Sequence, residues 1–213
     1  AVSQNYGIAV RHAWTVKSFS DKPELPVVMG GVHISELPDT LSRDMDVAVI
    51  GEGERTFTEL IKSFLFYGKF PPEAISQIKG LAFRNPDGSI HRTEDRPLIE
   101  PLDNIPHPAR DLLKTRGEFG IFSSRGCPYR CYFCSSSRFW EKVRFFSAEY
   151  VLDEIRQIVH KYGAKRISFH DDIFIADVLR LERLVELIRA DKSLSKVKFK
   201  ANARANLVNE HTA

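Results

Sequence analysis

The segment Gly126-Cys127-Pro128-Tyr129-Arg130-Cys131-Tyr132-Phe133-Cys134 carries every cysteine of the chain, in the spacing C-x3-C-x2-C. A disulfide framework would normally distribute an even number of cysteines through the sequence. Three thiols within eight residues instead indicate metal ligands in a protein of a reducing compartment. We therefore predict a metal centre in this segment and a cytoplasmic location.

The number of thiols separates two kinds of metal centre. Four cysteines saturate a 4Fe–4S cluster, one for each iron, whereas three leave one iron open to a ligand. A structural zinc site would need a fourth ligand, which His107 or His170 could supply. Such zinc sites usually present two separated cysteine pairs, and a second pair is missing here. The pattern favours the cluster over zinc, and over cysteines that are merely buried in a core.

The cysteine segment lies inside an alternation of strands and helices. The pattern predicts, in order, a strand at 121–124, a helix capped by Ser147 and ending at Tyr162, a strand at 166–170, a helix capped by Asp177, and a strand at 197–200. Such alternation predicts a parallel sheet, either open or part of a barrel. Because three strands cannot close a barrel, we expect residues 116–213 to be part of a larger domain.

The first part of the chain has the same α/β character. The pattern predicts a helix at 6–18, a buried strand at 27–29 that ends at Gly30-Gly31, a second buried strand at 47–50 that ends at Gly51-Glu52-Gly53-Glu54, and a helix with an apolar face formed by Phe57, Leu60, Ile61, Phe64 and Leu65. Short apolar strands that end in glycines are typical of a parallel sheet. We assign residues 1–69 to this first domain.

Residues 70–115 have a different texture. Leu81–Arg84 and Ser89–Arg92 flank a turn that contains Pro86, Asp87 and Gly88, which predicts a β-hairpin. Several prolines follow and exclude a long helix. We interpret this stretch as a linker that carries its own small hairpin.

Composition excludes several classes of function. Of the 213 residues, 43% are hydrophobic and 28% are charged, as in a soluble globular protein. No apolar run approaches the roughly 20 residues of a membrane helix, so we predict no membrane partner. The net charge of +3 is spread without a clustered basic face, which argues against nucleic acid as a partner.

The cysteine spacing, with Phe133 just before the last cysteine and a strand before the first, resembles the signature of the radical S-adenosylmethionine (radical SAM) family. The resemblance implies that Cys127, Cys131 and Cys134 bind a 4Fe–4S cluster and that SAM chelates the open iron. One electron from the cluster then cleaves SAM to a 5′-deoxyadenosyl radical, which takes a hydrogen atom from a substrate. It also implies that Phe133 lies near the adenine of SAM.

The family has a second motif after the next strand, predicted here at 166–170. In the family, polar groups of this motif contact the amino group of SAM. This chain has Asp171-Asp172 there instead of the common Gly-Gly-Glu. The same substitution is found in the cobalamin-linked branch of the family. The resemblance implies a SAM contact, with Asp172 favoured over Asp171, and the alternative is that either aspartate only turns the chain. Arg204, after the third strand, is a candidate for the SAM carboxylate, with a solvated charge as the alternative.

The order of the whole chain resembles the cobalamin-binding branch, in which a Rossmann-like domain precedes a (β/α) radical SAM barrel. By this resemblance the chain spans the end of the first domain and the first half of the barrel. Gly30 and Gly31, and the turn from Gly51 and Glu52, would approach the cobalamin. The Asp-x-His-x-x-Gly signature of many cobalamin proteins is absent, and we interpret His33 as an ordinary loop histidine.

These resemblances favour a cobalamin-dependent radical SAM enzyme that performs methyl transfer or ring formation on an unactivated carbon. They imply a small-molecule substrate, which the sequence does not identify, and a reductant such as flavodoxin or ferredoxin. A cobalamin-independent enzyme, such as a methylthiotransferase, is one alternative. A non-catalytic binding module stabilised by zinc or by a cluster is another. We expect the 213-residue chain alone to be inactive.

Overall fold

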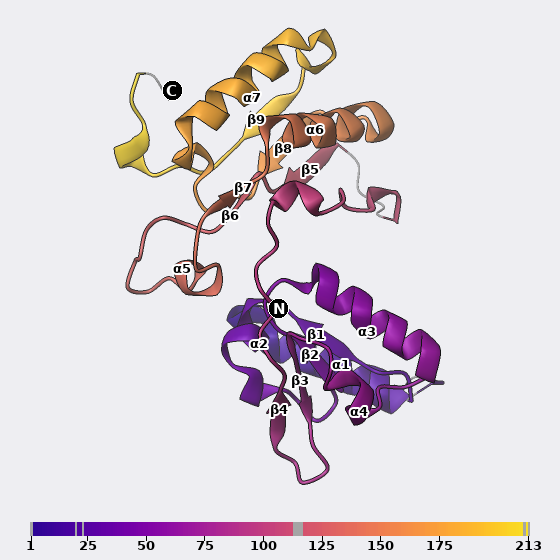
Figure 1. The fold of residues 1–213 in the computed structure, drawn as a ribbon. Coiled ribbons are helices and arrows are strands. Elements are labelled where there is room, and N and C mark those ends of the chain that lie inside the picture. The colour runs from indigo at the N-terminus through magenta and orange to yellow at the C-terminus, as the bar shows by residue number, and fades with distance from the viewer. Residues whose placement is uncertain (1, 20, 23, 113–116, 211, 213) are drawn as a thin grey trace. The chain divides into compact units, whose positions relative to one another are not determined.

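The computed structural model of the chain describes residues 2–19, 21–22, 24–112, 117–210 and 212. The chain divides into two compact units, Ala1–Ile99 and Glu100–Ala213, each of which is described by itself (Figure 1). Within the described residues, no helix combines the length and the apolar character that a membrane crossing requires.

The first unit is built on a four-stranded sheet in the order β1-β2-β3-β4. Its strands are β1 (Val28–Gly30), β2 (Val47–Val49), β3 (Leu81–Arg84) and β4 (Ile90–Arg92), and its helices are α1 (Tyr6–Phe19), α2 (Val32–Glu36), α3 (Gly53–Tyr67) and α4 (Pro72–Ile75). β1 and β2 are parallel, whereas β3 and β4 join in antiparallel pairs. The predicted strands and the long helices are therefore present, with ends within a residue or two of those expected.

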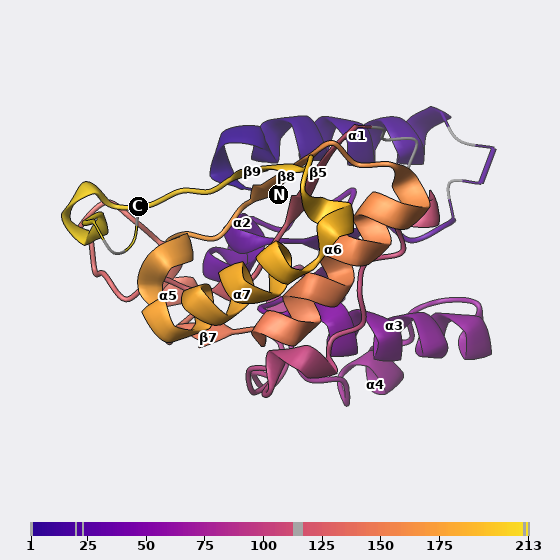
Figure 2. The same ribbon diagram turned by 90° about the horizontal axis from the view of Figure 1, so that it is seen from above.

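Helices cover both faces of this sheet. Ala48 and its neighbours on one face pack with α1 and α2, whereas Val47 and Val49 on the other face pack with α3 and α4. Figure 2 shows α1 on one side of the unit and α3 and α4 on the other. Because successive side chains of a strand point to opposite faces, β2 is buried on both sides.

The predicted hairpin forms, but it is part of the first sheet. β3 pairs with β2 through Val47↔Phe83 and Val49↔Leu81, so residues 81–92 complete the sheet and do not stand apart as a linker. The compact unit accordingly ends at Ile99, later than the expected boundary at residue 69. The other expected boundary, at residues 115 and 116, lies outside the described residues.

The second unit contains a three-stranded parallel sheet in the order β5-β8-β9. Its strands are β5 (Glu118–Ile121), β6 (Ser124–Arg125), β7 (Arg144–Phe145), β8 (Arg166–Phe169) and β9 (Lys198–Lys200), and its helices are α5 (Ser136–Phe139), α6 (Ala148–Tyr162) and α7 (Val178–Ala190). Short 3-10 helices along the chain lie at Ser3–Asn5, Pro38–Thr40, Leu102–Asn104, Arg110–Leu112, Phe174–Ala176, Lys192–Leu194 and Ala205–Leu207.

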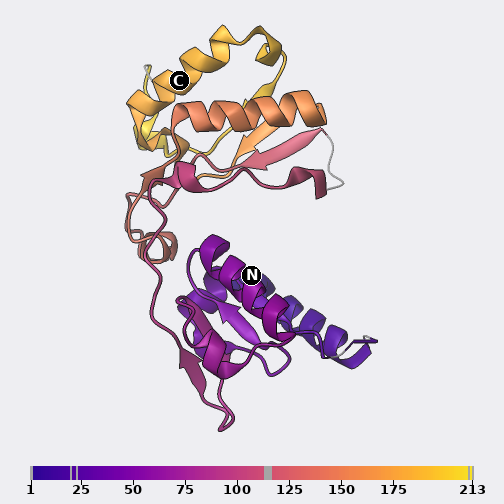
Figure 3. The same ribbon diagram turned by 45° about the vertical axis from the view of Figure 1, so that its right-hand side comes forward.

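The two long helices of this unit run side by side over one face of the sheet (Figures 2 and 3). In β5, Phe119 and Ile121 are buried, whereas Glu118 and Gly120 are exposed on the other face. The predicted helix caps are confirmed: the Ser147 side chain accepts a hydrogen bond from Tyr150 N, and that of Asp177 accepts one from Arg180 N.

The strand expected at 121–124 is wrong in position. β5 starts and ends three residues earlier, at Glu118–Ile121, and Ser124 begins the separate strand β6. A signal for the correct position was present, because Glu118–Ile121 alternates exposed and buried residues, as expected of a half-buried strand.

The apolar face of α3 is only partly covered. Leu60 is fully buried, whereas Leu65 is 77% exposed and Phe57 is 47% exposed, so the expected helix with an apolar face forms but buries only part of that face. The helical period shows that apolar side chains share a stripe, but only the neighbouring elements decide how much of the stripe is covered.

This difference predicts unequal effects of two matched substitutions. Leu60→Ala should lower the free energy of unfolding by about 2–5 kcal/mol, because it leaves a cavity in the core. Leu65→Ala, on the same helix, should change it by no more than about 0.5 kcal/mol. Urea unfolding followed by circular dichroism measures both values, and similar losses for the two variants would contradict this packing.

Candidate functional site: the cysteine loop and the strand ends around it

The cysteine loop, defined here as residues 126–143, is closed by a short antiparallel stem formed by β6 and β7. Ser124 pairs with Phe145 and Arg125 with Arg144. Gly126 follows the stem with φ of +97°, and a Cβ at this position would lie 2.6 Å from the carbonyl oxygen of Lys142. A glycine is therefore required here for both its backbone conformation and its close approach to the returning strand.

The three cysteines of the loop are all free thiols and all half-buried. Cys131 and Cys134 share a tight turn, in which Cys134 N donates to Cys131 O at 3.0 Å. Among the residues that the structure describes, no three His, Cys, Asp or Glu side chains are gathered closely enough to hold a metal ion. Three soft thiol donors in one loop fit an iron–sulfur cluster by their chemistry, and the loop must close further to bring them together.

Arg204 lies against the cysteine loop, although it is distant in sequence. Its guanidinium carbon is 3.9 Å from the centre of the Tyr129 ring, and its Nη1 is 3.6 Å from Cys131 Sγ. Asn206 Nδ2 also donates to the Tyr129 hydroxyl at 3.3 Å. The structure thus brings a predicted binding residue and a predicted metal ligand together, and it places a positive charge where a thiolate or a carboxylate would be favoured.

The predicted aromatic residue of the loop points into solvent. Phe133 is 92% exposed and its neighbour Tyr132 is almost completely exposed. Two adjacent large aromatic side chains without cover leave apolar surface available to a planar ligand.

The two aspartates after β8 have different environments. Asp171 is buried, and its carboxylate accepts hydrogen bonds from Ser123 and Ser124 at the start of the stem. Asp172 is exposed, and its Oδ2 accepts a hydrogen bond from the Ser136 hydroxyl, just beyond the last cysteine. Of the two, only Asp172 presents its carboxylate at the surface next to the cysteine loop.

Sequence reasoning missed two residues of this edge, Ser123 and Arg180. Arg180 is buried, and it donates from Nη2 to Ser123 Oγ at 3.1 Å and from Nη1 to Ser123 O at 3.3 Å. A signal was available, because Arg180 lies one helical turn before the buried Leu184 and so interrupts the apolar stripe of α7.

The histidines considered as zinc ligands have other surroundings. His107 Nδ1 lies 2.8 Å from Gln157 Nε2, and its ring packs against Tyr150. His170 lies over Gly120 so closely that a Cβ there would be 2.3 Å from its Nε2. It lines a cavity of about 180 Å³ on the exposed face of the sheet with Ser168, Lys200 and Asn202 among others. Among the residues that the structure describes, neither histidine belongs to a group of three side chains that could hold a metal ion.

In the first unit, the predicted glycine turns lie side by side at the ends of β1 and β2. Ser35 joins them: its hydroxyl donates to Gly31 O at 3.0 Å and accepts from Gly51 N at 2.9 Å. A Cβ at Gly30 or at Gly51 would meet no atom within 4 Å, so this edge is open to a ligand.

Two other candidate residues of this unit, Glu52 and His33, make hydrogen-bond contacts inside the unit. Glu52 is buried, and its carboxylate accepts from Ile99 N at 2.7 Å. His33 is also buried, in α2 and not in a loop, where its ring stacks on Tyr6. The Ser3 and Thr40 hydroxyls lie at hydrogen-bond distance from its two ring nitrogens.

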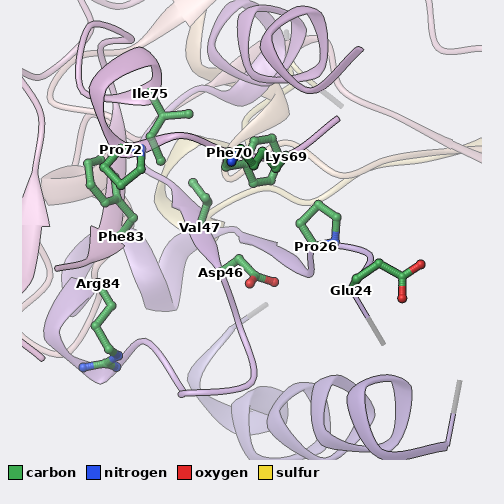
Figure 4. Close-up of a pocket in the computed structure, with 10 residues that line it drawn as sticks. All are labelled: Glu24, Pro26, Asp46, Val47, Lys69, Phe70, Pro72, Ile75, Phe83 and Arg84. Atoms are coloured by element: carbon green, nitrogen blue, oxygen red, sulfur yellow. The ribbon is translucent and has the colours of Figure 1, made fainter. Parts of the chain in front are cut away.

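The first unit also has a cavity of about 300 Å³, shown in Figure 4. Pro26 and Asp46, which line it, precede β1 and β2, so the cavity lies at the opposite strand ends from the glycine turns. The Asp46 carboxylate there already accepts from Val27 N at 2.7 Å and pairs with Lys17 Nζ at 2.9 Å. We do not include this cavity in the candidate site.

The second unit is a parallel α/β domain with three free thiols in the loop that follows its first strand. Residues 121–208 match the model of the radical SAM superfamily. This part of the chain is therefore a radical SAM domain.

Proteins of similar sequence include a methyltransferase and a cyclase. An uncharacterized methyltransferase of Pyrococcus horikoshii is 37% identical over 199 residues, which are 88% of this chain and 41% of that protein. The anaerobic magnesium-protoporphyrin IX monomethyl ester cyclase of Rubrivivax gelatinosus is 28% identical over 78% of this chain and 37% of its own length. The chain thus spans between a quarter and about two fifths of the length of the curated relatives it matches.

Solved structures show the same fold. The cobalamin-dependent radical SAM enzyme OxsB, with aqua-cobalamin and SAM bound, has a TM-score of 0.73 at 22% identity, over 97% of this chain and 30% of its own. The radical SAM methyltransferase TsrM of Kitasatospora setae, with cobalamin and a [4Fe-4S] cluster bound, also has a TM-score of 0.73. It is 18% identical over 98% of this chain and 42% of its own.

The close approach at the stem gives a test by two glycine substitutions. Gly163→Ala meets no atom within 4 Å and should cost only the strain of a positive φ, about 1–2 kcal/mol. Gly126→Ala faces a φ of +97°, outside the left-handed region that other residues adopt, and must also displace the Lys142 carbonyl, so it should cost more and loosen the cysteine loop. Thermal unfolding and limited proteolysis of the loop measure these effects. Equal losses, with an equally resistant loop, would contradict the geometry.

Proposed function

We propose that this chain is part of a radical SAM enzyme in which Cys127, Cys131 and Cys134 hold one 4Fe–4S cluster and leave one iron for SAM. The observation that carries the proposal is the set of three free thiols in a single closed loop, within the region matched by the superfamily. Three ligands for four irons make the remaining iron available to a chelating ligand. Cluster binding would draw the loop together, since metal binding and local ordering are coupled.

The residues around the loop suggest how SAM would be held. Arg204, beside Cys131 and Tyr129, is placed to pair with the SAM carboxylate. Asp172, exposed at the same edge, would accept from the amino group, and the uncovered Phe133 would pack on the adenine. When bound, the reduced cluster supplies the electron that cleaves SAM to a 5′-deoxyadenosyl radical. A flavodoxin or ferredoxin would be the source of that electron.

The open glycine edge of the first unit supports a cobalamin site. Two adjacent turns without side chains, at Gly30-Gly31 and at Gly51, allow a large cofactor to approach the backbone. Strand ends of a parallel sheet are also the usual side for ligands. Glu52 would shape this edge through its bond to Ile99 and would not touch the cofactor with its side chain. We assign no cobalt ligand to His33, because both ring nitrogens have partners within the unit.

Methyl transfer or ring formation on a small molecule is the reaction we propose. The relatives include methyltransferases and cyclases by name, among them a cytidylyl-2-hydroxyethylphosphonate methyltransferase of Streptomyces wedmorensis. Those substrates are small molecules, which supports the same class of substrate here. No feature of the described residues favours transfer to RNA.

The cluster is tested by anaerobic reconstitution of the full-length protein with iron and sulfide. We expect about four irons per chain and an EPR signal of the reduced protein that changes when SAM is added. Cys131→Ser should lose most of the iron, because a thiolate ligand is removed. Tyr132→Phe, an exposed change in the same loop, should retain the iron and serves as the matched control.

Three outcomes would count against parts of this proposal. Zinc in place of iron would exclude the radical SAM reaction and support a structural module. A cluster signal indifferent to SAM would exclude the open iron. An intact, SAM-responsive protein without a stoichiometric corrinoid absorption band would exclude the cobalamin site and leave a cobalamin-independent enzyme.

A further inference from the structure

We infer that Asp171, Ser123 and Arg180 form a positioning network that fixes the stem of the cysteine loop to the end of the parallel sheet. By this inference Asp171 acts on the cluster site through the stem and not by contact with SAM. The inference rests on the proposed function, because it assigns these residues a role in presenting the three thiols.

The first support is that both carboxylate oxygens of Asp171 accept hydrogen bonds from within the protein. Asp171 is 2% exposed. Its Oδ1 accepts from Ser123 N at 2.7 Å and from Ser124 N at 2.8 Å, and its Oδ2 accepts from Ser123 Oγ at 2.5 Å. A carboxylate that receives three short donors is held in one orientation by charge-assisted hydrogen bonds. Both oxygens therefore face the chain that leaves β5, and neither is exposed to a ligand.

The second support is the buried guanidinium on the other side of Ser123. Arg180 donates to Ser123 Oγ at 3.1 Å, and this hydroxyl in turn donates to Asp171, so the three side chains form a connected series. Burial lowers the pKa of Arg180, and the negative charges of Asp171 and Asp177 oppose that change. A buried charge with such partners is retained as a charge and strongly restrains its neighbours.

The third support is the reach of the network into both strands of the stem. The Ser123 carbonyl accepts from Phe146 N at 3.1 Å and from Arg180 Nη1 at 3.3 Å. The guanidinium of Arg180 also lies 5.1 Å from the centre of the Phe145 ring, in β7. One arginine therefore contacts Ser123, the residue just before the strand that enters the cysteine loop, and Phe145 in the strand that leaves it. Fixing these two strands fixes the separation of the loop ends, and with it the span available to the thiols.

The neighbouring Asp172 provides the contrast that makes the inference testable. It has the same side chain one residue later, but it is exposed and contacts Ser136 beyond the cysteines. If Asp171 only positions the stem, replacing it by asparagine must impair a different property of the protein than replacing Asp172 by asparagine does.

The experiment compares Asp171→Asn with Asp172→Asn in the full-length protein, using two readouts. The first is iron content and the EPR spectrum of the reduced protein, with and without SAM. The second is hydrogen exchange of the peptide that contains Ser123 and Ser124, which does not depend on the cluster. We expect Asp171→Asn to accelerate exchange in this peptide about tenfold or more, because the Ser123 and Ser124 amides lose a charged acceptor. It should also reduce the iron content and alter the spectrum before SAM is added.

Asp172→Asn should leave exchange and iron content unchanged and should lose only the response to SAM. Ser123→Ala is a milder variant that removes the shared hydroxyl, and it should reproduce the exchange and spectral changes if Asp171→Asn is too unstable to study. An Asp171→Asn protein with normal exchange and a full, unaltered cluster that ignores SAM would overturn the inference, since Asp171 would then contact SAM. A wild-type protein without a SAM-responsive cluster would instead refute the proposed function, and the exchange measurement would still decide the role of Asp171 in the stem.

Discussion

The parallel pairing of β5 with β8 is the constraint on which the second unit depends. Its register sets Ile121 opposite Phe169, so the two chains leave the sheet together at one edge. Ser123 and Asp171 each follow the paired residues by two positions, and their contact is therefore a consequence of the register. A slip of one residue would turn every side chain of one strand to the other face of the sheet and separate the pair. The stem and its cysteine loop continue from this fixed point.

A similar device holds the strand ends in both units. In the first, the Ser35 hydroxyl donates to the turn after β1 and accepts from the turn after β2. In the second, the Ser123 hydroxyl donates to Asp171 and accepts from Arg180. Serine suits this position because one small group both donates and accepts. Joining two strand-end loops gives an edge with defined geometry, and function in parallel sheets is concentrated at such edges.

Local features of this fold could be predicted from the sequence, because each depends on neighbouring residues. Ser147 and Asp177 cap their helices as expected, since a cap needs only its own turn. The coverage of α3 could not be predicted, because Leu60 and Leu65 share one apolar pattern and differ only in what packs on them. The position of β3 was missed for the same reason: a hairpin is local, whereas its pairing with β2 is not.

The site likewise has features that local sequence predicts and features that depend on residues far apart in the chain. The spacing of Cys127, Cys131 and Cys134 is readable as a ligand set, because all three are in one loop. The role of Asp171 is not, because its partner Ser123 is 48 residues away and is joined to it only by strand pairing. An acid after a strand, taken alone, fits a ligand contact as well as a structural one. The arginine on the apolar stripe of α7 favours the structural role, because the buried Arg180 donates to Ser123, whose hydroxyl donates in turn to Asp171.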